Sequence, residues 1–121
     1  MAVTDNYKAF VVEQLGRVLP EVRARAMFGG VGVYSTTLFF ALIDDDVLYF
    51  KVDDRTRPEY EARQMPPFRP FGEGGEVMQY YEVPADVLED EDALRRWGEA
   101  AVDVARRAKQ RRSPRRGARG T

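Results

Sequence analysis

The 121-residue sequence contains neither cysteine nor histidine. Without cysteine the chain can form no disulfide, and it has no thiolate metal ligand and no cysteine nucleophile. Histidine is the commonest general base and metal ligand near neutral pH, so its absence excludes Ser-His catalysis and zinc sites of the usual kinds. An enzyme would have to work with carboxylates, lysine or tyrosine alone. The sequence therefore predicts a protein that is not an enzyme, with no catalytic residue, no metal and no cofactor.

Long apolar runs are also missing. No segment approaches the ~18 consecutive apolar residues of a membrane span. The first six residues do not place a basic region before an apolar one, as a secretory signal would. These features predict a cytoplasmic protein with no membrane contact. A length of 121 residues, 44% of them hydrophobic, predicts one domain with a modest core.

Acidic residues are absent from the C-terminal end. Residues 106–121 hold eight basic residues, whereas residues 1–105 carry a net charge of −9. The eight are Arg106, Arg107, Lys109, Arg111, Arg112, Arg115, Arg116 and Arg119. Such a cluster could bind the phosphates of a nucleic acid, or it could be a solubilising end that touches the acidic body. We predict a folded domain over residues 1–109 and a disordered arginine-rich tail over residues 110–121.

Apolar periodicity predicts an α+β fold, a mostly antiparallel sheet with flanking helices in the order α-β-β-β-α-β-β-α. The expected helices span residues 5–19, 55–64 and 90–112, with a short turn or helix at 84–88. The expected strands span residues 31–34, 38–43, 47–52 and 77–83, with an extended segment at 65–71, a glycine turn at 72–75, and a further strand if 22–28 joins the sheet. Tyr7, Phe10, Val11 and Val18 form the expected buried stripe of the first helix. In the last helix the expected buried face is Leu94, Trp97, Ala101, Val104, Ala105 and Ala108.

Three glycines, Gly29, Gly30 and Gly32, lie close together before an apolar run. A dinucleotide fingerprint would need a third glycine three residues after Gly32, and a P-loop would need a following Gly-Lys-Ser/Thr. Both lead into a helix, and here another strand is expected. We therefore interpret the cluster as a bulge or a close backbone approach in a curved strand. By similar reasoning Asp44, Asp45 and Asp46 are interpreted as a solvated hairpin turn and not as a cation site.

Aromatic residues are frequent in the predicted strands, and most of them are expected in the core. If some instead lie on an exposed sheet face beside basic residues, they could stack nucleic-acid bases. Arg23, Arg25, Lys51 and Arg69 would form a basic strip on that face if their strands adjoin.

The chain resembles the N-terminal domain of the TfoX/Sxy family over about residues 5–108. The matching stretches are residues 25–34 (RAMFGGVGVY), 40–43 (FALI), 48–52 (LYFKV), Pro67-Phe68, 78–84 (MQYYEVP) and Trp97. The motif residues, expected to be mainly structural, are Arg25, Met27, Phe28, Gly29, Gly30, Gly32, Tyr49, Phe50, Lys51, Tyr81 and Pro84. The resemblance implies an α+β fold similar to secretion chaperones and supplies no catalytic residue. The arginine-rich tail stands where full regulators of this family carry a helical C-terminal domain, so the chain is expected to be a stand-alone N-domain.

The resemblance also implies a link to bacterial regulators of natural competence, which are transcriptional coactivators acting beside the cyclic-AMP receptor protein. We therefore expect a regulatory protein that acts by protein–protein contact, with transcription machinery or a regulator as its partner. The alternative is a nucleic-acid-binding protein that uses the basic tail or the basic–aromatic sheet face. A strand edge or an apolar sheet face could also support a homodimer.

Overall fold

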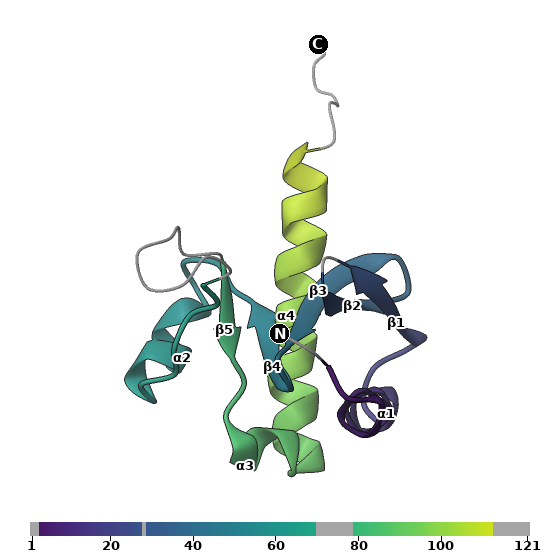
Figure 1. Ribbon diagram of the computed structural model, residues 1–121. Helices are drawn as coiled ribbons and strands as arrows, with labels where there is room; N and C mark the ends of the chain where they lie inside the picture. Colours follow the sequence, from purple (N-terminus) through teal and green to yellow (C-terminus); the bar gives the residue numbers. More distant parts are fainter. Residues whose placement is uncertain (1–2, 28, 70–78, 113–121) are drawn as a thin grey trace.

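The computed structural model describes residues 3–27, 29–69 and 79–112 (Figure 1). The elements are α1 (Asp5–Gly16), β1 (Val22–Met27), β2 (Gly30–Ser35), β3 (Leu38–Asp44), β4 (Val47–Lys51), α2 (Arg57–Ala62), β5 (Tyr80–Glu82), α3 (Ala85–Leu88) and α4 (Glu91–Arg112). The strands form one antiparallel sheet in the order β1-β2-β3-β4-β5. The predicted α+β class with a mostly antiparallel sheet and flanking helices is therefore confirmed.

The strands are distributed around α2 differently from the prediction. In the described part of the chain four strands precede α2 and one follows it, because residues 22–27 do join the sheet as β1. The extended segment after α2 makes only an isolated bridge between Pro67 and Tyr81. Pro66 and Pro67 have no backbone N–H, so the segment cannot continue a regular ladder. The predicted turn at 72–75 and the start of the predicted strand at 77–83 lie outside the described residues.

The first helix begins where the side chain of Thr4 accepts a hydrogen bond from the backbone N–H of Tyr7. Val11 and Leu15 are fully buried, but Phe10 is 40% exposed. The predicted stripe was therefore wrong at Phe10. Apolar residues occupy two faces of this helix, and the face that packs is the one carrying Val11 and Leu15; Val18, which is also buried, follows the end of the helix at Gly16.

The core lies between the sheet and α4, which runs behind the sheet in Figure 1. Phe40 and Phe50 are fully buried, with their ring centroids 5.7 Å apart. Trp97 of α4 packs edge-on against Tyr60 of α2 at 4.7 Å. The predicted buried face of the last helix is confirmed for Leu94, Trp97, Ala101, Val104 and Ala105, and Ala108 is half-buried.

The glycine cluster spans the turn between β1 and β2, where Gly29 lies, and the first residues of β2, Gly30 and Gly32. Gly29 has a φ of +82°, which side chains rarely adopt. A Cβ on Gly30 would lie 2.7 Å from the carbonyl oxygen of Ile43, and one on Gly32 would lie 2.7 Å from Cε of Met27. The predicted close backbone approach is therefore confirmed. Since β2 follows directly, no helix N-terminus faces this turn.

The three consecutive aspartates lie at the β3–β4 hairpin, as predicted. Asp45 and Asp46 have φ values of +54° and +59°, the conformation that a tight two-residue hairpin turn requires. Asp46 also has a second role, because its carboxylate accepts hydrogen bonds from the backbone N–H and the hydroxyl of Thr4. The turn therefore fixes the start of α1 against the sheet.

At the C-terminal end α4 continues through Arg112, so the boundary predicted at residue 110 falls within the last turn of this helix. Residues 113–121 lie outside the described residues. The helix is held at this end by Arg107, which contacts both Asp103 and Asp53. Asp53 also accepts hydrogen bonds from the backbone N–H groups of Arg55 and Thr56, just before α2. One carboxylate thus joins the end of β4, the start of α2 and α4.

Replacing Asp53 with asparagine should lower the free energy of unfolding by about 1–2 kcal/mol, because charge-assisted hydrogen bonds are lost. Burial raises the pKa of Asp53, but hydrogen bonds from Arg107 and from two backbone N–H groups outweigh it and lower the pKa below its ordinary value. The stabilisation is therefore present above about pH 4 and is lost as the pH falls through the folded-state pKa. Urea unfolding of both proteins at pH 7 and pH 3 measures this. An equal difference between them at both pH values would contradict it.

Candidate functional site

The sheet face opposite the core carries a row of aromatic and basic side chains. Tyr34 and Phe39 stack with ring centroids 5.1 Å apart, and Phe39 lies 6.0 Å from Tyr80. The guanidinium of Arg23 lies 6.0 Å above the Tyr34 ring, and the ammonium of Lys51 lies 5.1 Å above the Tyr80 ring. We call these residues the basic–aromatic strip: Arg23, Tyr34, Phe39, Tyr80 and Lys51.

Strand pairing brings the strip together. Arg23 lies opposite Tyr34, Tyr34 opposite Phe39, and Lys51 opposite Tyr80. Of the four residues of the predicted basic strip, Arg23 and Lys51 thus lie at the two ends of the basic–aromatic strip. Arg25 lies beside Arg23 on the same face of β1, opposite Gly32. Arg69 is exposed and follows Phe68, whose ring packs on Tyr49 at 5.0 Å.

The aromatic residues divide between the two faces of the sheet. Of the aromatic residues predicted for the strands and the segment after α2, Phe40, Phe50, Tyr80 and Tyr81 are buried, Phe39, Tyr49 and Phe68 are half-buried, and Phe71 lies outside the described residues. Tyr34, Phe39 and Tyr49 are half-buried on the face opposite the core, where their ring contacts are with one another, with Tyr80 and with Phe68. This face therefore offers ring surface of Tyr34, Phe39 and Tyr49 to a binding partner, whereas Tyr80 is buried beneath its neighbours.

The basic end of α4 lies next to the strip at Lys51. A shallow cavity of about 230 Å³ is lined by Thr37, Phe39, Lys51 and Lys109, among others. The ammonium of Lys109 is 3.5 Å from the hydroxyl of Thr37. A neighbouring cavity brings Lys51 together with Arg111. Two features that the sequence suggests separately, the basic sheet face and the basic C-terminal end, therefore adjoin.

The predicted tail residues differ in how they are engaged. Arg106 pairs with Asp103, and Arg107 pairs with Asp53 and Asp103, so binding another anion would compete with these contacts. Lys109 and Arg111 make no ion pair with a described residue. Arg112 ends α4, and Arg115, Arg116 and Arg119 lie outside the described residues. Among the predicted tail residues whose side chains the structure describes, Lys109 and Arg111 are therefore the two that could bind an anion without breaking an ion pair.

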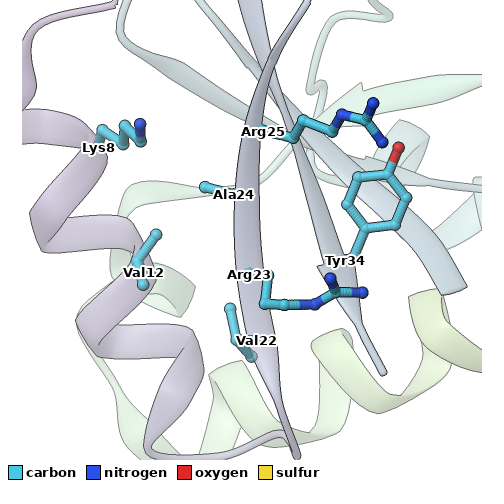
Figure 2. A pocket seen from close by; sticks show the side chains of 7 residues that line it. All are labelled: Lys8, Val12, Val22, Arg23, Ala24, Arg25 and Tyr34. Atoms are coloured by element: carbon cyan, nitrogen blue, oxygen red, sulfur yellow. The ribbon is translucent and has the colours of Figure 1, made fainter. Parts of the chain in front are cut away.

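A groove of about 550 Å³ runs between α1 and β1 (Figure 2). Its lining residues are Lys8, Val12, Val22, Arg23, Ala24, Arg25 and Tyr34. In Figure 2 the side chains of Lys8 and Val12 point from α1 toward β1, whereas Arg25 and Tyr34 point to the far side of β1. All three charged residues of the lining are positive, in a body whose net charge is negative. Through Tyr34 the groove is continuous with the basic–aromatic strip.

Sequence reasoning missed Lys8 and Val12 as candidate site residues. Nothing in the local sequence of α1 indicates which side of the sheet the helix packs on, so no local pattern would have identified them. The family motif was expected to be mainly structural, and Gly30, Gly32 and Phe50 fit that role. In contrast, Arg25 and Lys51 lie on the groove and the strip, and Tyr49 lies on the same sheet face. Phe28 lies outside the described residues.

The sheet face is acidic at its other end, around Tyr49 and Glu82, which are paired across β4 and β5. Burial raises the pKa of the Glu82 carboxyl. Burial, together with Glu82, Asp44 and Asp45, also raises the pKa of Tyr49. The outer face therefore runs from basic beside β1 and Lys51 to acidic beside the β3–β4 hairpin.

Replacing Glu82 with glutamine should stabilise the protein at pH 7, because a partly buried charge is removed. A raised folded-state pKa means that the native carboxyl contributes most below its unfolded pKa of about 4.3 and loses that contribution as the pH rises. The advantage of the Glu82→Gln variant should therefore disappear near pH 3.5. Thermal melts of both proteins across this range test the sign. A glutamine variant that is less stable than the native protein at pH 7 would contradict the assignment.

The buried tyrosines are poorly suited to act as bases. Burial raises the pKa of Tyr60. Burial and a hydrogen bond to Glu61, with the Tyr81 hydroxyl 3.2 Å from a carboxylate oxygen, raise that of Tyr81. Both hydroxyls are therefore protonated at neutral pH. Among the residues that the structure describes, no three histidine, cysteine or acidic side chains are grouped to hold a metal ion.

The fold and this surface define a small α+β domain with one face of its sheet built into the core and a basic, aromatic surface on the other. The chain belongs to the TfoX N-terminal domain family, whose family model matches residues 13–105. This confirms the resemblance seen in the sequence. No curated protein matches the chain. The family match ends before Arg106, so all eight C-terminal basic residues lie beyond it. None of the described helices is long and apolar enough to span a bilayer.

Proposed function

We propose that this protein is a non-enzymatic regulator that acts by protein contact in transcription-related regulation. Family membership supports the biological setting. The observation that carries the contact role is the basic–aromatic strip, where rings and cations lie together on a sheet face outside the core. Tyrosine and arginine are enriched among the residues that dominate binding energy at protein interfaces.

A strain lacking the gene tests this role through its transcript profile. The native gene should restore the profile, and a Tyr34→Ser, Phe39→Ser double variant should not, although the protein remains folded. Phe10→Ser is the matched control, because Phe10 is an exposed ring outside the strip. A transcript profile that does not change when the gene is deleted would refute the regulatory role.

The second candidate is binding of single-stranded nucleic acid. The observation that favours it is the junction at Lys51, where the strip meets Lys109 and Arg111. Stacked rings can hold bases while neighbouring cations contact phosphates. In this case Lys51→Ala and Lys109→Ala should each weaken binding of a labelled oligothymidylate. Each should also reduce the slope of log affinity against log salt by about 0.7 per lost phosphate contact.

Arg55→Ala is the control for this assay, because Arg55 is an exposed arginine on the turn before α2. Deleting residues 113–121 in a separate variant measures the contribution of the remaining arginines. Oligothymidylate binding that is absent, or unchanged in the lysine variants, would reject this second candidate.

A further inference from the structure

Strand β1 lies at an edge of the sheet. Among the residues that the structure describes it pairs only with β2, in the register from Val22 opposite Ser35 to Met27 opposite Gly30. The N–H of Thr36 donates to the carbonyl of Glu21, which continues the same register. In an antiparallel ladder such pairs alternate, so odd-numbered residues of β1 face β2. The N–H and C=O groups of Val22, Ala24 and Ala26 therefore point away from the sheet.

The groove beside α1 adjoins this edge (Figure 2). Val22 and Ala24 line it, and no described residue forms a hydrogen bond with their outward backbone groups. An unpaired edge offers alternating donors and acceptors at the spacing of another extended chain. In Figure 2 the groove is bounded on the opposite side by Lys8 and Val12 of α1. A strand between β1 and α1 would contact both elements.

The positive charge of the groove favours a negatively charged binding partner. Lys8, Arg23 and Arg25 are its only charged lining residues, whereas residues 1–105 together have a net charge of −9. The Arg23 guanidinium donates to the carbonyl of Thr36 at 2.7 Å and lies over the Tyr34 ring, which holds it on the outer face beside the edge of β1 (Figure 2). Arg25 and Lys8 make no ion pair with a described residue. An occupant with acidic side chains would complement all three.

Two other occupants fit less well. A second copy of the chain, paired through β1 in antiparallel fashion, would bring the arginines of both copies together, and like charges on paired strands destabilise the pairing. A nucleic acid would find phosphate-binding cations here, but Tyr34 is the one ring of the lining, and it is already stacked on Phe39 and covered by the Arg23 guanidinium. An extended peptide uses both the backbone edge and the small apolar side chains.

We propose that β1 binds an extended acidic segment of a protein partner by strand addition in the groove between β1 and α1. Backbone groups of Val22 and Ala24 pair with the segment. Its acidic side chains, on one face of the added strand, meet Arg23 and Arg25, and its apolar side chains, on the other face, pack on Val12 and Ala24, where Lys8 adds to the positive charge (Figure 2). This inference rests on the proposed protein-contact function and specifies the chemistry of the partner. Strand addition of this kind takes affinity from main-chain hydrogen bonds and specificity from alternate side chains.

A fluorescein-labelled peptide of alternating glutamate and valine is the probe, with fluorescence anisotropy as the readout. Ala24→Pro removes an N–H that points away from the sheet, so it should leave the β1–β2 ladder intact and weaken binding about tenfold or more. Ala24→Ser, which retains the N–H, is the matched control. Arg25→Glu should also weaken binding, and Arg55→Glu should not. A peptide of alternating glutamine and valine should bind more weakly than the acidic one.

The far-ultraviolet spectrum and the melting temperature of each variant establish that it is folded. If Ala24→Pro does not fold, the Arg25→Glu and Arg55→Glu pair decides the result. Binding that Ala24→Pro leaves unchanged, equal binding of the glutamine peptide, or no binding to the native protein would overturn the proposal. If the native protein is a dimer in sedimentation and Ala24→Pro dissociates it, the edge binds a second copy of the chain. If the native protein binds oligothymidylate but not the peptide, and Arg25→Glu abolishes that binding, the edge binds nucleic acid. Either result overturns the proposal. If the peptide does not bind but deletion of the gene still changes the transcript profile, the proposed regulatory role stands and only the acidic strand-forming partner is rejected.

Discussion

Replacing Phe50 with alanine is expected to lower the free energy of unfolding by about 3–5 kcal/mol, the usual cost of deleting a fully buried phenylalanine. Phe50 has no exposed surface and packs against Phe40 with a centroid distance of 5.7 Å. It also lies opposite Ala41 on β3 and Tyr81 on β5, so the ring is enclosed by the middle of the sheet and the helical layer. Domains of this size are stabilised by about 5–15 kcal/mol, so the loss is a large fraction of the total.

Urea unfolding followed by circular dichroism measures this loss. Phe10→Ala is the matched control, because its ring is 40% exposed and lies outside the core cluster. It should change the free energy of unfolding by less than about 1 kcal/mol. Similar losses in the two variants would contradict the assignment of the core to the α4 face of the sheet.

The Gly30→Val variant is expected to be severely destabilised, by about 3 kcal/mol or more. Its Cβ alone would lie 2.7 Å from the carbonyl oxygen of Ile43, which is backbone and cannot rotate away. Overpacking of this kind typically costs about 1–3 kcal/mol, and the two further methyl-sized groups of valine add to it. The expected defect is in folding, because the strand that follows the turn leaves no site for a phosphate.

Gly16→Ala is the control for Gly30→Val. A Cβ at Gly16, at the end of α1, meets nothing within 4 Å, and alanine is the better helix former by about 1 kcal/mol. Its melting temperature should therefore equal or exceed that of the native protein. A Gly30→Val protein that melts with the native one would show that β2 and β3 are farther apart than described.

Much of the fold could be predicted because its signals are local. Alternating burial along β4 follows alternating side chains in the sequence, and Thr4 caps the first helix as predicted, although the helix ends at Gly16, three residues before the predicted end at residue 19. Phe10 was misplaced because apolar residues on two faces of α1 both satisfy a helical period, and only packing decides between them. The segment after α2 was predicted to be extended, but its prolines limit its pairing to one bridge.

The candidate site could be predicted only in part. Predicting the basic–aromatic strip required knowing which strands are neighbours in the sheet. The sequence suggested Arg23, Arg25 and Lys51 as candidates but not that their strands lie in one sheet. The groove depends on long-range facts, namely that β1 is at the edge of the sheet and that α1 lies beside it. The positive charge of the groove could therefore not be predicted from the sequence, in which Lys8 and Arg25 are far apart.

Amide hydrogen exchange at Ala24 reports whether a partner strand pairs with the edge of β1. In the free protein its N–H points away from β2 and should exchange rapidly, while the N–H groups of Arg23 and Arg25, which face β2, exchange slowly. Adding the glutamate–valine peptide should slow exchange at Ala24 and leave Arg23 and Arg25 protected. Exchange at Ala24 that stays rapid when the peptide is bound would contradict strand addition at β1.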